Sequence, residues 1–228
     1  MIGVIIPAHN EERMIAACLA SVQRAALHPS LRGEAVRPLV VLDACTDASA
    51  EIVADFGFDA LCIAARNVGV ARGAGAQALL AHGARWLAFT DADSHVAPDW
   101  LAAQLALAAD AVCGPVSVDD WSALAPGARA AWERRYRDMD GHRHVHGANL
   151  GVAAHAYLRA GGFPPLACSE DVALVDLLIA TGATLAWSAA PRVVTSGRLD
   201  ARVRGGFGDT LAAWANGLDD SSEPSAAP

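Results

Sequence analysis

Two aspartates at the end of an apolar run are the side chains that say most about the chemistry of this chain. Residues 85–94 read RWLAFTDADS, so a buried strand is expected to end on Asp91 and Asp93. The carboxyl ends of strands in an open α/β sheet form the edge where ligands bind. Two carboxylates one residue apart can hold a divalent cation, and such a cation commonly bridges to a phosphate. The sequence therefore predicts a metal and phosphate site here.

The elements that position these aspartates follow from alternating apolar runs and amphipathic stretches. Strands are expected at residues 2–6, 39–42, 60–64 and 85–90. Helices are expected at residues 10–26, 46–56 and 70–82, with Asn10 as the cap of the first and Thr46 or Asp47 as the cap of the second. This alternation is typical of a parallel sheet with right-handed crossovers. It places residues 7–9, 43, 66–67 and 91–93 along one edge.

The remaining part of the chain has a weaker pattern. Helices are expected at residues 99–109, 127–138 and 169–181, with a short one ending near residue 159. Strands are expected at residues 111–118 and 145–152, and near residues 185 and 193. A last helix is expected after Gly205 and Gly206, and the polar tail at residues 219–228 is expected to be disordered.

Composition excludes several classes of protein. The chain has 228 residues, of which 54% are hydrophobic, and this suits one large α/β domain or two lobes that share a sheet. The net charge of −8 gives no electrostatic footprint for nucleic acid. There is no lysine, which excludes a Schiff-base lysine and a phosphate-loop lysine.

The expected location follows from cysteine usage and hydropathy. The five cysteines are odd in number, form no CxxC pair and mostly have apolar neighbours, as reduced core thiols do. No leader peptide is evident, and no run approaches the roughly 18–20 apolar residues of a membrane span. We therefore expect a cytoplasmic protein that could still act at a membrane surface.

A series of motifs in the expected order resembles family 2 glycosyltransferases of the GT-A fold. They read IIPAHNEE at 5–12, VVLDACTD at 40–47, NVGVARGAG at 67–75, DAD at 91–93, GAN at 147–149, GGF at 161–163 and SED at 169–171. The resemblance covers about residues 2–175 and fades after Thr181. Two positions depart from the family pattern, because Leu42 replaces the usual first aspartate of the second motif and His9 replaces the common tyrosine.

The resemblance implies an α/β, GT-A-like fold, a three-layer αβα sandwich around a central mixed, mostly parallel sheet. It implies one catalytic domain at residues 1–218, with a nucleotide-sugar-binding half at 1–115 and an acceptor half at 116–218. The implied reaction moves a sugar, with inversion, from a nucleotide-diphospho-sugar (a UDP, GDP or dTDP sugar) to a hydroxyl acceptor. The implied cofactor is Mn²⁺ or Mg²⁺. The sequence leaves the donor base and sugar, the acceptor and the oligomeric state open.

The resemblance also assigns site residues. Asp93 is the direct metal ligand, and Asp91 is either a second ligand or a residue that faces the ribose. Asp171 is the general base, at a helix N-terminus that favours its ionised form, and Glu170 is the second candidate. Donor contacts are expected from Pro7, Ala8, His9, Glu11, Asp43, Asn67, Arg72, Asp91 and Ala92, with Asp43 on the nucleobase. Acceptor contacts are expected from Gly147, Ala148, Asn149, Gly162, Phe163 and Trp121.

Each of these groups also has a purely structural interpretation. The acidic pairs at 91/93 and 170/171 could be a turn and a helix cap. Asp43 could be a turn residue, Arg72 a solvated helix residue, and Gly161 with Gly162 a simple turn. Large aromatic residues are more often in a core than stacked on a sugar, and this applies to Trp121, Trp132 and Tyr136.

Two further segments are candidates for function. His142, His144 and His146 alternate in sequence, so in an extended segment they share one face and could hold a metal, lie near the diphosphate or acceptor, or be plain surface residues. The Arg- and Gly-rich segment at 196–206 could close over the diphosphate or be a solvated loop.

Three rival functions are alternatives to glycosyl transfer. A nucleotidyltransferase on a similar sheet needs a Gly-rich phosphate loop with a basic residue after the first strand, where this chain has Ala8-His9-Asn10. A nucleotide-sugar-binding protein without transfer activity would not need Asp93 and Asp171. A metallohydrolase built on the His142–His146 cluster would act with water alone.

Overall fold

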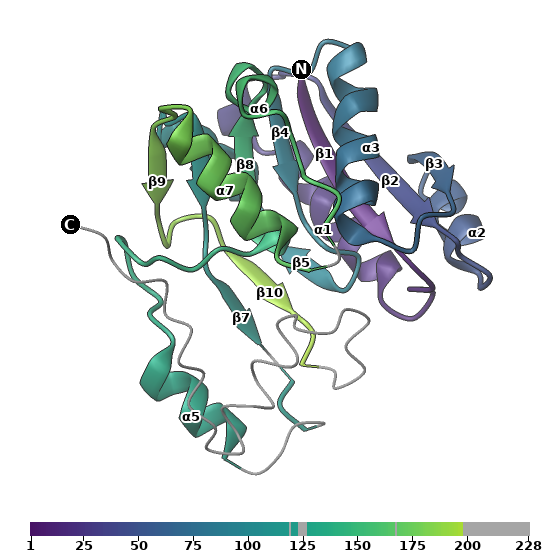
Figure 1. Ribbon diagram of the computed structural model, residues 1–228. Helices are drawn as coiled ribbons and strands as arrows, with labels where there is room; N and C mark the ends of the chain where they lie inside the picture. Colours follow the sequence, from purple (N-terminus) through teal and green to yellow (C-terminus); the bar gives the residue numbers. More distant parts are fainter. Residues whose placement is uncertain (119, 123–126, 167, 198–228) are drawn as a thin grey trace.

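Seven strands form the central sheet of this protein, in the order β3-β2-β1-β4-β8-β6-β9 (Figure 1). The computed structural model describes residues 1–118, 120–122, 127–166 and 168–197. The strands are β1 (Ile2–Ala8), β2 (Val36–Asp43), β3 (Asp59–Ile63), β4 (Trp86–Phe89), β6 (Ala111–Cys113), β8 (Leu150–Ala153) and β9 (Leu185–Trp187). Strand β8 is antiparallel to both of its neighbours and every other pairing is parallel. The expected mixed, mostly parallel sheet is confirmed.

Helices cover both faces of this sheet. They are α1 (Ile15–Ala26), α2 (Ser49–Asp55), α3 (Val68–Ala81), α4 (Trp100–Ala106), α5 (Ala128–Arg135), α6 (Ala154–Ala160) and α7 (Glu170–Ala180), with short 3₁₀ helices η1 (Pro29–Leu31) and η2 (Gly147–Asn149). In Figure 1, α3, α6 and α7 lie in front of the sheet, and α1 lies behind it, packed on α2 and α4. This is the three-layer arrangement that the family resemblance implies.

A second, three-stranded sheet lies beyond the carboxyl ends of the central strands. It has the order β5-β10-β7, with β5 (Ser94–Val96), β7 (Val116–Val118) and β10 (Val193–Thr195). Helix α5 lies past it, farthest from the central sheet (Figure 1).

The first four strands follow from local sequence. Every residue of β1 is buried, as its run of branched apolar side chains predicts. Helix α3 packs closely on this part of the sheet, because a Cβ added to Gly75 would lie 2.7 Å from Cγ2 of Ile5. Strand β1 lies between β2 and β4, so the strand order reverses beside it. In α/β sheets such a switch point opens a crevice at the carboxyl ends of the strands.

Several predicted element boundaries are wrong. Asn10 does not cap α1, which begins at Ile15, because Asn10 has a φ of 55° and its Oδ1 accepts the Thr46 amide at 2.7 Å. The strand predicted at 111–118 is two strands, β6 and β7, which lie in different sheets on either side of Gly114-Pro115. The strand predicted at 145–152 starts at Leu150, after η2.

Other expectations lie at the edge of the described residues. Strand β5 has no counterpart among the expected elements, since its three residues carry no period of their own. The helix expected after Gly206, the tail at 219–228 and most of the Arg- and Gly-rich segment lie outside the described residues. No helix of the described part of the chain has the length and apolar character of a membrane span.

Candidate active site

The carboxyl ends of β1, β2 and β4 meet at one edge of the central sheet. Because β8 is antiparallel, its amino end lies at the same edge, and residue pairing places Leu150 opposite Phe89. The 3₁₀ helix η2 therefore lies beside the Asp91–Asp93 turn. Strand pairing thus brings the metal candidates next to the acceptor candidates, although about sixty residues of sequence separate them.

The end of β1 contributes mainly backbone to this edge. Pro7 and Ala8 are buried within the strand, and the Ala8 carbonyl accepts a hydrogen bond from Cys45 Sγ at 3.3 Å. The His9 ring is half-buried, with Nδ1 2.6 Å from the carbonyl oxygen of Asp43. Glu11 is buried, and its amide donates to Ser49 Oγ at 2.8 Å. Of these four donor candidates, His9 alone has a partly exposed side chain at this edge.

Asp43, at the end of β2, shapes the loop between β3 and α3. Its Oδ1 accepts the amides of Ala65 and Arg66 at 2.7 and 2.8 Å, and its Oδ2 accepts the amide of Asn67 at 2.8 Å. The side chain is 4% exposed. Both oxygens accept hydrogen bonds within the protein, and the nucleobase contact that the resemblance implies for Asp43 stays a prediction.

Asn67 connects this loop to the two helices beside the site. Its Oδ1 accepts the Val70 amide at 3.0 Å and so caps α3. Its Nδ2 donates to the carbonyl oxygen of Leu166 at 3.0 Å, in the segment that precedes α7. Asn67 therefore holds the start of α3 against the approach to the candidate base.

The Asp91–Asp93 turn presents one carboxylate to Arg72 and the other to hydroxyl groups. Asp91 Oδ1 accepts from Arg72 Nη2 at 2.5 Å. Asp93 is half-buried, and its Oδ1 and Oδ2 accept from Ser94 Oγ at 3.3 Å and Ser196 Oγ at 2.9 Å. Ala92 is buried, so its methyl group packs inward. Asp91 is thus paired with a charged group of the protein, whereas Ser94 and Ser196 bond to Asp93 through neutral hydroxyl groups.

Arg72 lies inside the protein, between two carboxylates. Its side chain is 5% exposed, its Nη2 pairs with Asp91, and its Nη1 pairs with Glu170 Oε1. Burial alone would lower the pKa of Arg72, but the charges of Asp91 and Glu170 outweigh it and raise that pKa. The solvated-helix interpretation of Arg72 is wrong, because the side chain is buried between two carboxylates, while its contact with a donor stays a prediction.

Glu170 and Asp171 begin α7 with different surroundings. Glu170 is 3% exposed, and burial raises its pKa even though Arg72 opposes the rise. Asp171 is half-buried, with Oδ2 accepting the Gly147 amide at 2.7 Å and Oδ1 accepting the Val172 amide at 2.8 Å. Because Glu170 is enclosed and paired, Asp171 is the carboxylate that an acceptor hydroxyl could reach.

The acceptor candidates differ sharply in what they can contact. Gly147 donates its amide to Asp171, and Ala148 beside it is buried. Asn149 is fully buried, with Oδ1 accepting from Trp100 Nε1 and Nδ2 donating to the carbonyl groups of Pro115 and Pro191. Asn149 therefore joins the two sheets, and the expected acceptor contact does not fit its geometry.

The remaining acceptor candidates pack against apolar neighbours. Phe163 lies edge-on to Phe89 at 5.1 Å between ring centroids, and a Cβ on Gly162, whose φ is 78°, would lie 3.0 Å from the Tyr157 ring. Trp121 is half-buried and donates through Nε1 to the Val118 carbonyl at 2.9 Å. Trp121 thereby contacts the end of β7 and, by its ring, Trp132 of α5.

The three alternating histidines share one face, as predicted, but their nitrogens bond within the protein. Their rings form a stack with centroids 5.5 and 6.0 Å apart. His142 Nδ1 accepts the His144 amide, His144 Nε2 accepts the Arg137 amide, and His146 Nε2 lies 2.9 Å from the Tyr136 hydroxyl. Burial lowers the pKa of His144 to about 4 and that of His146 to about 3. The hydrogen bonds that these ring nitrogens make within the protein argue against a histidine metal site.

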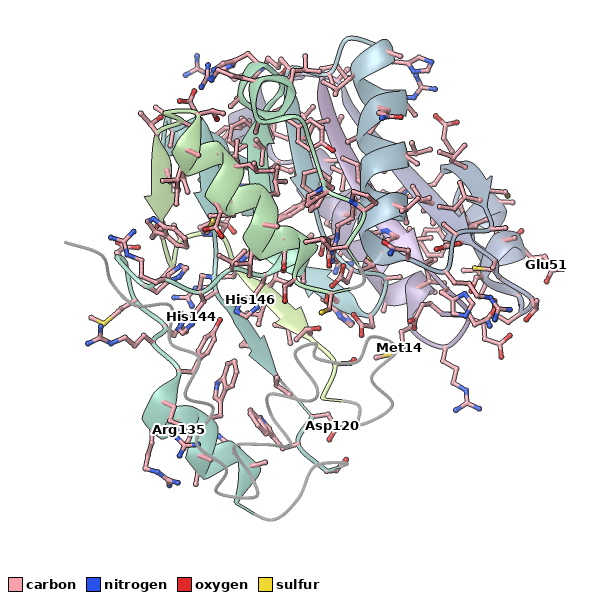
Figure 2. The ribbon with its side chains drawn as sticks, viewed as in Figure 1. Met14, Glu51, Asp120, Arg135, His144 and His146 are labelled. Carbon is pink, nitrogen blue, oxygen red and sulfur yellow. The ribbon has the colours of Figure 1, made fainter. Side chains whose placement is uncertain are left out.

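Aromatic rings extend this stack toward α5. The ring of Tyr136 stacks on those of Trp132 and His144, with centroids 3.7 and 4.1 Å apart. The rings of Trp132 and Trp121 are tilted to each other, with centroids 6.0 Å apart. Figure 2 shows His144 and His146 between α7 and α5. Both faces of the Tyr136 ring are covered by other rings, so the core interpretation fits Tyr136 better than stacking on a sugar.

Asp91 and Asp93 can be compared with the ligands that a divalent cation takes in proteins. In the described part of the chain, no group of three or more His, Cys, Asp and Glu side chains could hold a metal ion by itself. Magnesium bound to a substrate phosphate usually takes one or two protein carboxylates and fills its other positions with phosphate oxygens and water. Asp93, with Asp91 beside it, fits that donor set.

Two hydroxyl groups near this site were missed by sequence reasoning. Ser196 donates to Asp93, and Ser94 donates to Thr195 Oγ1 at 3.0 Å. Both contacts depend on the antiparallel pairing of β5 with β10. No local signal could have found them, because the paired residues are about one hundred positions apart.

Comparison with known proteins supports the same fold. The sequence model described as Glycosyl transferase family 2 matches residues 3–149. No curated protein sequence matches the chain.

Among solved structures, the S. aureus protein TarS (residues 1–349, in complex with UDP) has a TM-score of 0.65 at 13% identity, covering 86% of this chain and 60% of that one. Mannosyltransferase PcManGT from Pyrobaculum calidifontis, in complex with GDP-Man and Mn²⁺, has a TM-score of 0.64 at 20% identity, covering 88% and 58%. GalNAc-T7, with UDP, GalNAc and Mn²⁺, has a TM-score of 0.60 at 16% identity, covering 88% and 44%. The chain thus spans 60% or less of the length of these three structures.

Proposed function

Because the chain belongs to glycosyl transferase family 2, we propose that it is a glycosyltransferase that uses a nucleotide-diphospho-sugar and a divalent cation. The acceptor group is a hydroxyl, and the anomeric centre is inverted. The proposed donor-binding half is residues 1–115 and the acceptor half is residues 116–218.

The donor class is supported by what the related folds hold. TarS is a complex with UDP, PcManGT with GDP-Man and Mn²⁺, and GalNAc-T7 with UDP and Mn²⁺. We therefore put UDP and GDP sugars first among the donors of this chain, ahead of dTDP sugars. Mn²⁺ or Mg²⁺ is the proposed cofactor.

One observation carries the proposal. Asp171, far from Asp91 in sequence, lies at the same edge of the sheet and is connected to it through Glu170 and Arg72. An inverting transfer needs a group that holds the departing diphosphate and a base that faces the acceptor hydroxyl. This edge provides carboxylates for both tasks within one bonded network.

Each carboxylate has a separate task. Asp93, with Asp91 beside it, would hold the cation, which when bound neutralises charge that develops on the leaving diphosphate. Asp171 accepts the proton of the acceptor hydroxyl as that oxygen attacks the anomeric carbon. The Gly147 amide fixes the orientation of the Asp171 carboxylate through Oδ2.

The donor proposal is tested by thermal unfolding with UDP, GDP, dTDP and ADP, each with and without Mn²⁺. A ligand that binds the folded state stabilises it by mass action, by about 2.7 kcal/mol at one hundred times its Kd. We expect one diphosphate to raise the melting temperature, and only when Mn²⁺ is present. Equal shifts from all four, or none, would contradict the donor proposal.

The base is tested with Asp171→Asn, which keeps the size of the side chain and one oxygen for the Gly147 amide. Turnover, measured as release of nucleoside diphosphate with candidate acceptors or water, should fall about 10²–10⁴-fold. Donor binding should persist. Asp176→Asn, on an exposed position of the same helix, is the matched control and should behave as wild type. Loss of donor binding in Asp171→Asn would instead place Asp171 in the donor pocket.

A further inference from the structure

We propose that Arg72 is a positioning residue that locks the metal-binding turn and the base helix together. The inference rests on the proposed glycosyl transfer, and it gives Arg72 a role distinct from donor contact. Arg72 lies on α3, Asp91 follows β4 and Glu170 begins α7, so one side chain connects three elements.

The contacts of Arg72 suit a planar guanidinium. Nη2 donates to Asp91 Oδ1 at 2.5 Å, and Nη1 donates to Glu170 Oε1. A guanidinium directs its two terminal nitrogens in fixed directions, whereas a lysine ammonium offers one flexible point. Arg72 therefore sets the spacing between the two carboxylates as well as balancing their charge.

The ion pairs of Arg72 with Asp91 and Glu170 are closely packed against neighbouring backbone. A Cβ added to Gly147 would lie 2.3 Å from Cζ of Arg72 and 2.4 Å from each Nη atom. A Cβ added to Gly69 would lie 3.0 Å from Cβ and Cγ of Glu170. The backbone of η2 thus packs directly against the guanidinium of Arg72, and the backbone at the start of α3 packs directly against Glu170. Interiors packed in this way transmit displacement instead of absorbing it.

The network ends at the two groups that do the chemistry. Asp91 is two residues from Asp93, and Glu170 is next to Asp171 in the chain. Gly147, which lies on Arg72, also donates its amide to Asp171 at 2.7 Å. A shift of Arg72 therefore moves both the cation ligand and the base, while the β1 and β2 ends that surround the expected nucleoside site keep their own bonds.

The test compares turnover with binding in a variant that removes the link together with the buried carboxylate of Glu170, so that of the two carboxylates paired with Arg72 only Asp91, which is 32% exposed, keeps its charge. Arg72→Met combined with Glu170→Met replaces the buried pair with apolar side chains, a change that is often neutral for folding. Binding of UDP and GDP with Mn²⁺ is measured by calorimetry. Donor hydrolysis by water is measured for UDP-GlcNAc and GDP-mannose.

We expect kcat to fall about 100-fold, the effect of misplacing reacting groups by about 1 Å, while KM and the diphosphate Kd change less than about threefold. Arg72→Lys, which keeps the charge but has one donor group, should have a kcat between those of the double variant and wild type. The control is Arg85→Met with Glu34→Met, which removes an ion pair outside the site and should leave both values unchanged.

Each outcome decides a separate question. If wild-type protein binds no diphosphate, the proposed function fails. If wild type binds and turns over but the double variant keeps its kcat, the positioning role is wrong. If KM and Kd rise while kcat is kept, Arg72 contacts the donor. Should the double variant not fold, the kcat of Arg72→Lys against its Kd decides between the same two roles.

Discussion

Gly147→Ala tests how tightly η2 rests on the buried guanidinium. The φ angle of Gly147 lies outside the left-handed region, so alanine can adopt the backbone without strain. The added Cβ would lie 2.3–2.4 Å from three atoms of Arg72, far inside normal contact distance. Arg72 cannot swing away, because Asp91 and Glu170 hold it. Any loss of stability must therefore come from this contact.

The size of the effect follows from overpacking. Inserting a methyl group into a filled interior typically costs about 1–3 kcal/mol. For a chain of 150–250 residues, 1 kcal/mol corresponds to a shift of about 2–4 °C in Tm. Gly147→Ala should therefore melt about 2–12 °C below wild type. Because the displaced Arg72 also moves Asp171, kcat should fall as well.

A matched control uses the same substitution where there is room. Gly73 lies in α3, and an added Cβ would meet nothing within 4 Å. Gly73→Ala should stabilise the protein by about 0.5–1 kcal/mol, since it lowers the entropy lost by the helix on folding. Calorimetry or urea unfolding measures both variants. If Gly147→Ala melts at or above wild type, the guanidinium does not lie against η2 and the argument fails.

Three further predictions concern stability. Because His144 and His146 have folded pKa values of about 4 and 3, below the unfolded value of about 6.5, they stabilise the fold above pH 6.5, and this is lost on acidification. The free energy of unfolding measured in urea should therefore be lower at pH 5 than at pH 7 by about 1–2 kcal/mol per histidine. A variant with both His144→Gln and His146→Gln should lose less stability between the two pH values, and an equal loss would refute this. Asp43→Asn should lower Tm and loosen the 65–67 loop, seen by amide exchange, because an amide NH₂ then faces a backbone donor; unchanged protection would contradict it. Asn149→Ala should cost about 1–3 kcal/mol for each buried group left unpaired, measured by urea unfolding, and a near-neutral result would mean that those groups find water.

Local sequence predicts the first half of the fold well. Strands β1 to β4 follow from short apolar runs, and the polar residues after them mark the ligand edge, because the end of a run and the end of a strand coincide. The second half fails where an element's partner decides its limits. Gly114-Pro115 divides residues 111–118 because each half pairs with a different sheet, and a three-residue strand such as β5 has too few residues to show a period.

The candidate site divides in the same way. Residue type and order mark the acidic pairs 91/93 and 170/171, because a carboxylate at a strand end or helix start follows from nearby sequence, and the family resemblance ranks Asp93 and Asp171 first. The roles of Asp43 and Arg72 do not follow from it. Both make internal bonds that local sequence does not record: Asp43 binds amides of a neighbouring loop, and Arg72 reaches Asp91 and Glu170, which are 19 and 98 positions away.

Short motifs are enough to show which side chains could perform chemistry and to which family the chain belongs. Tertiary structure alone decided which carboxylate stays accessible. Glu170 and Asp171 are neighbours in an acidic pair, yet one is enclosed with Arg72 and the other faces the edge beside Gly147. The physical reason is that burial and charge pairing depend on how closely α3, η2 and α7 approach, and no local pattern records that distance.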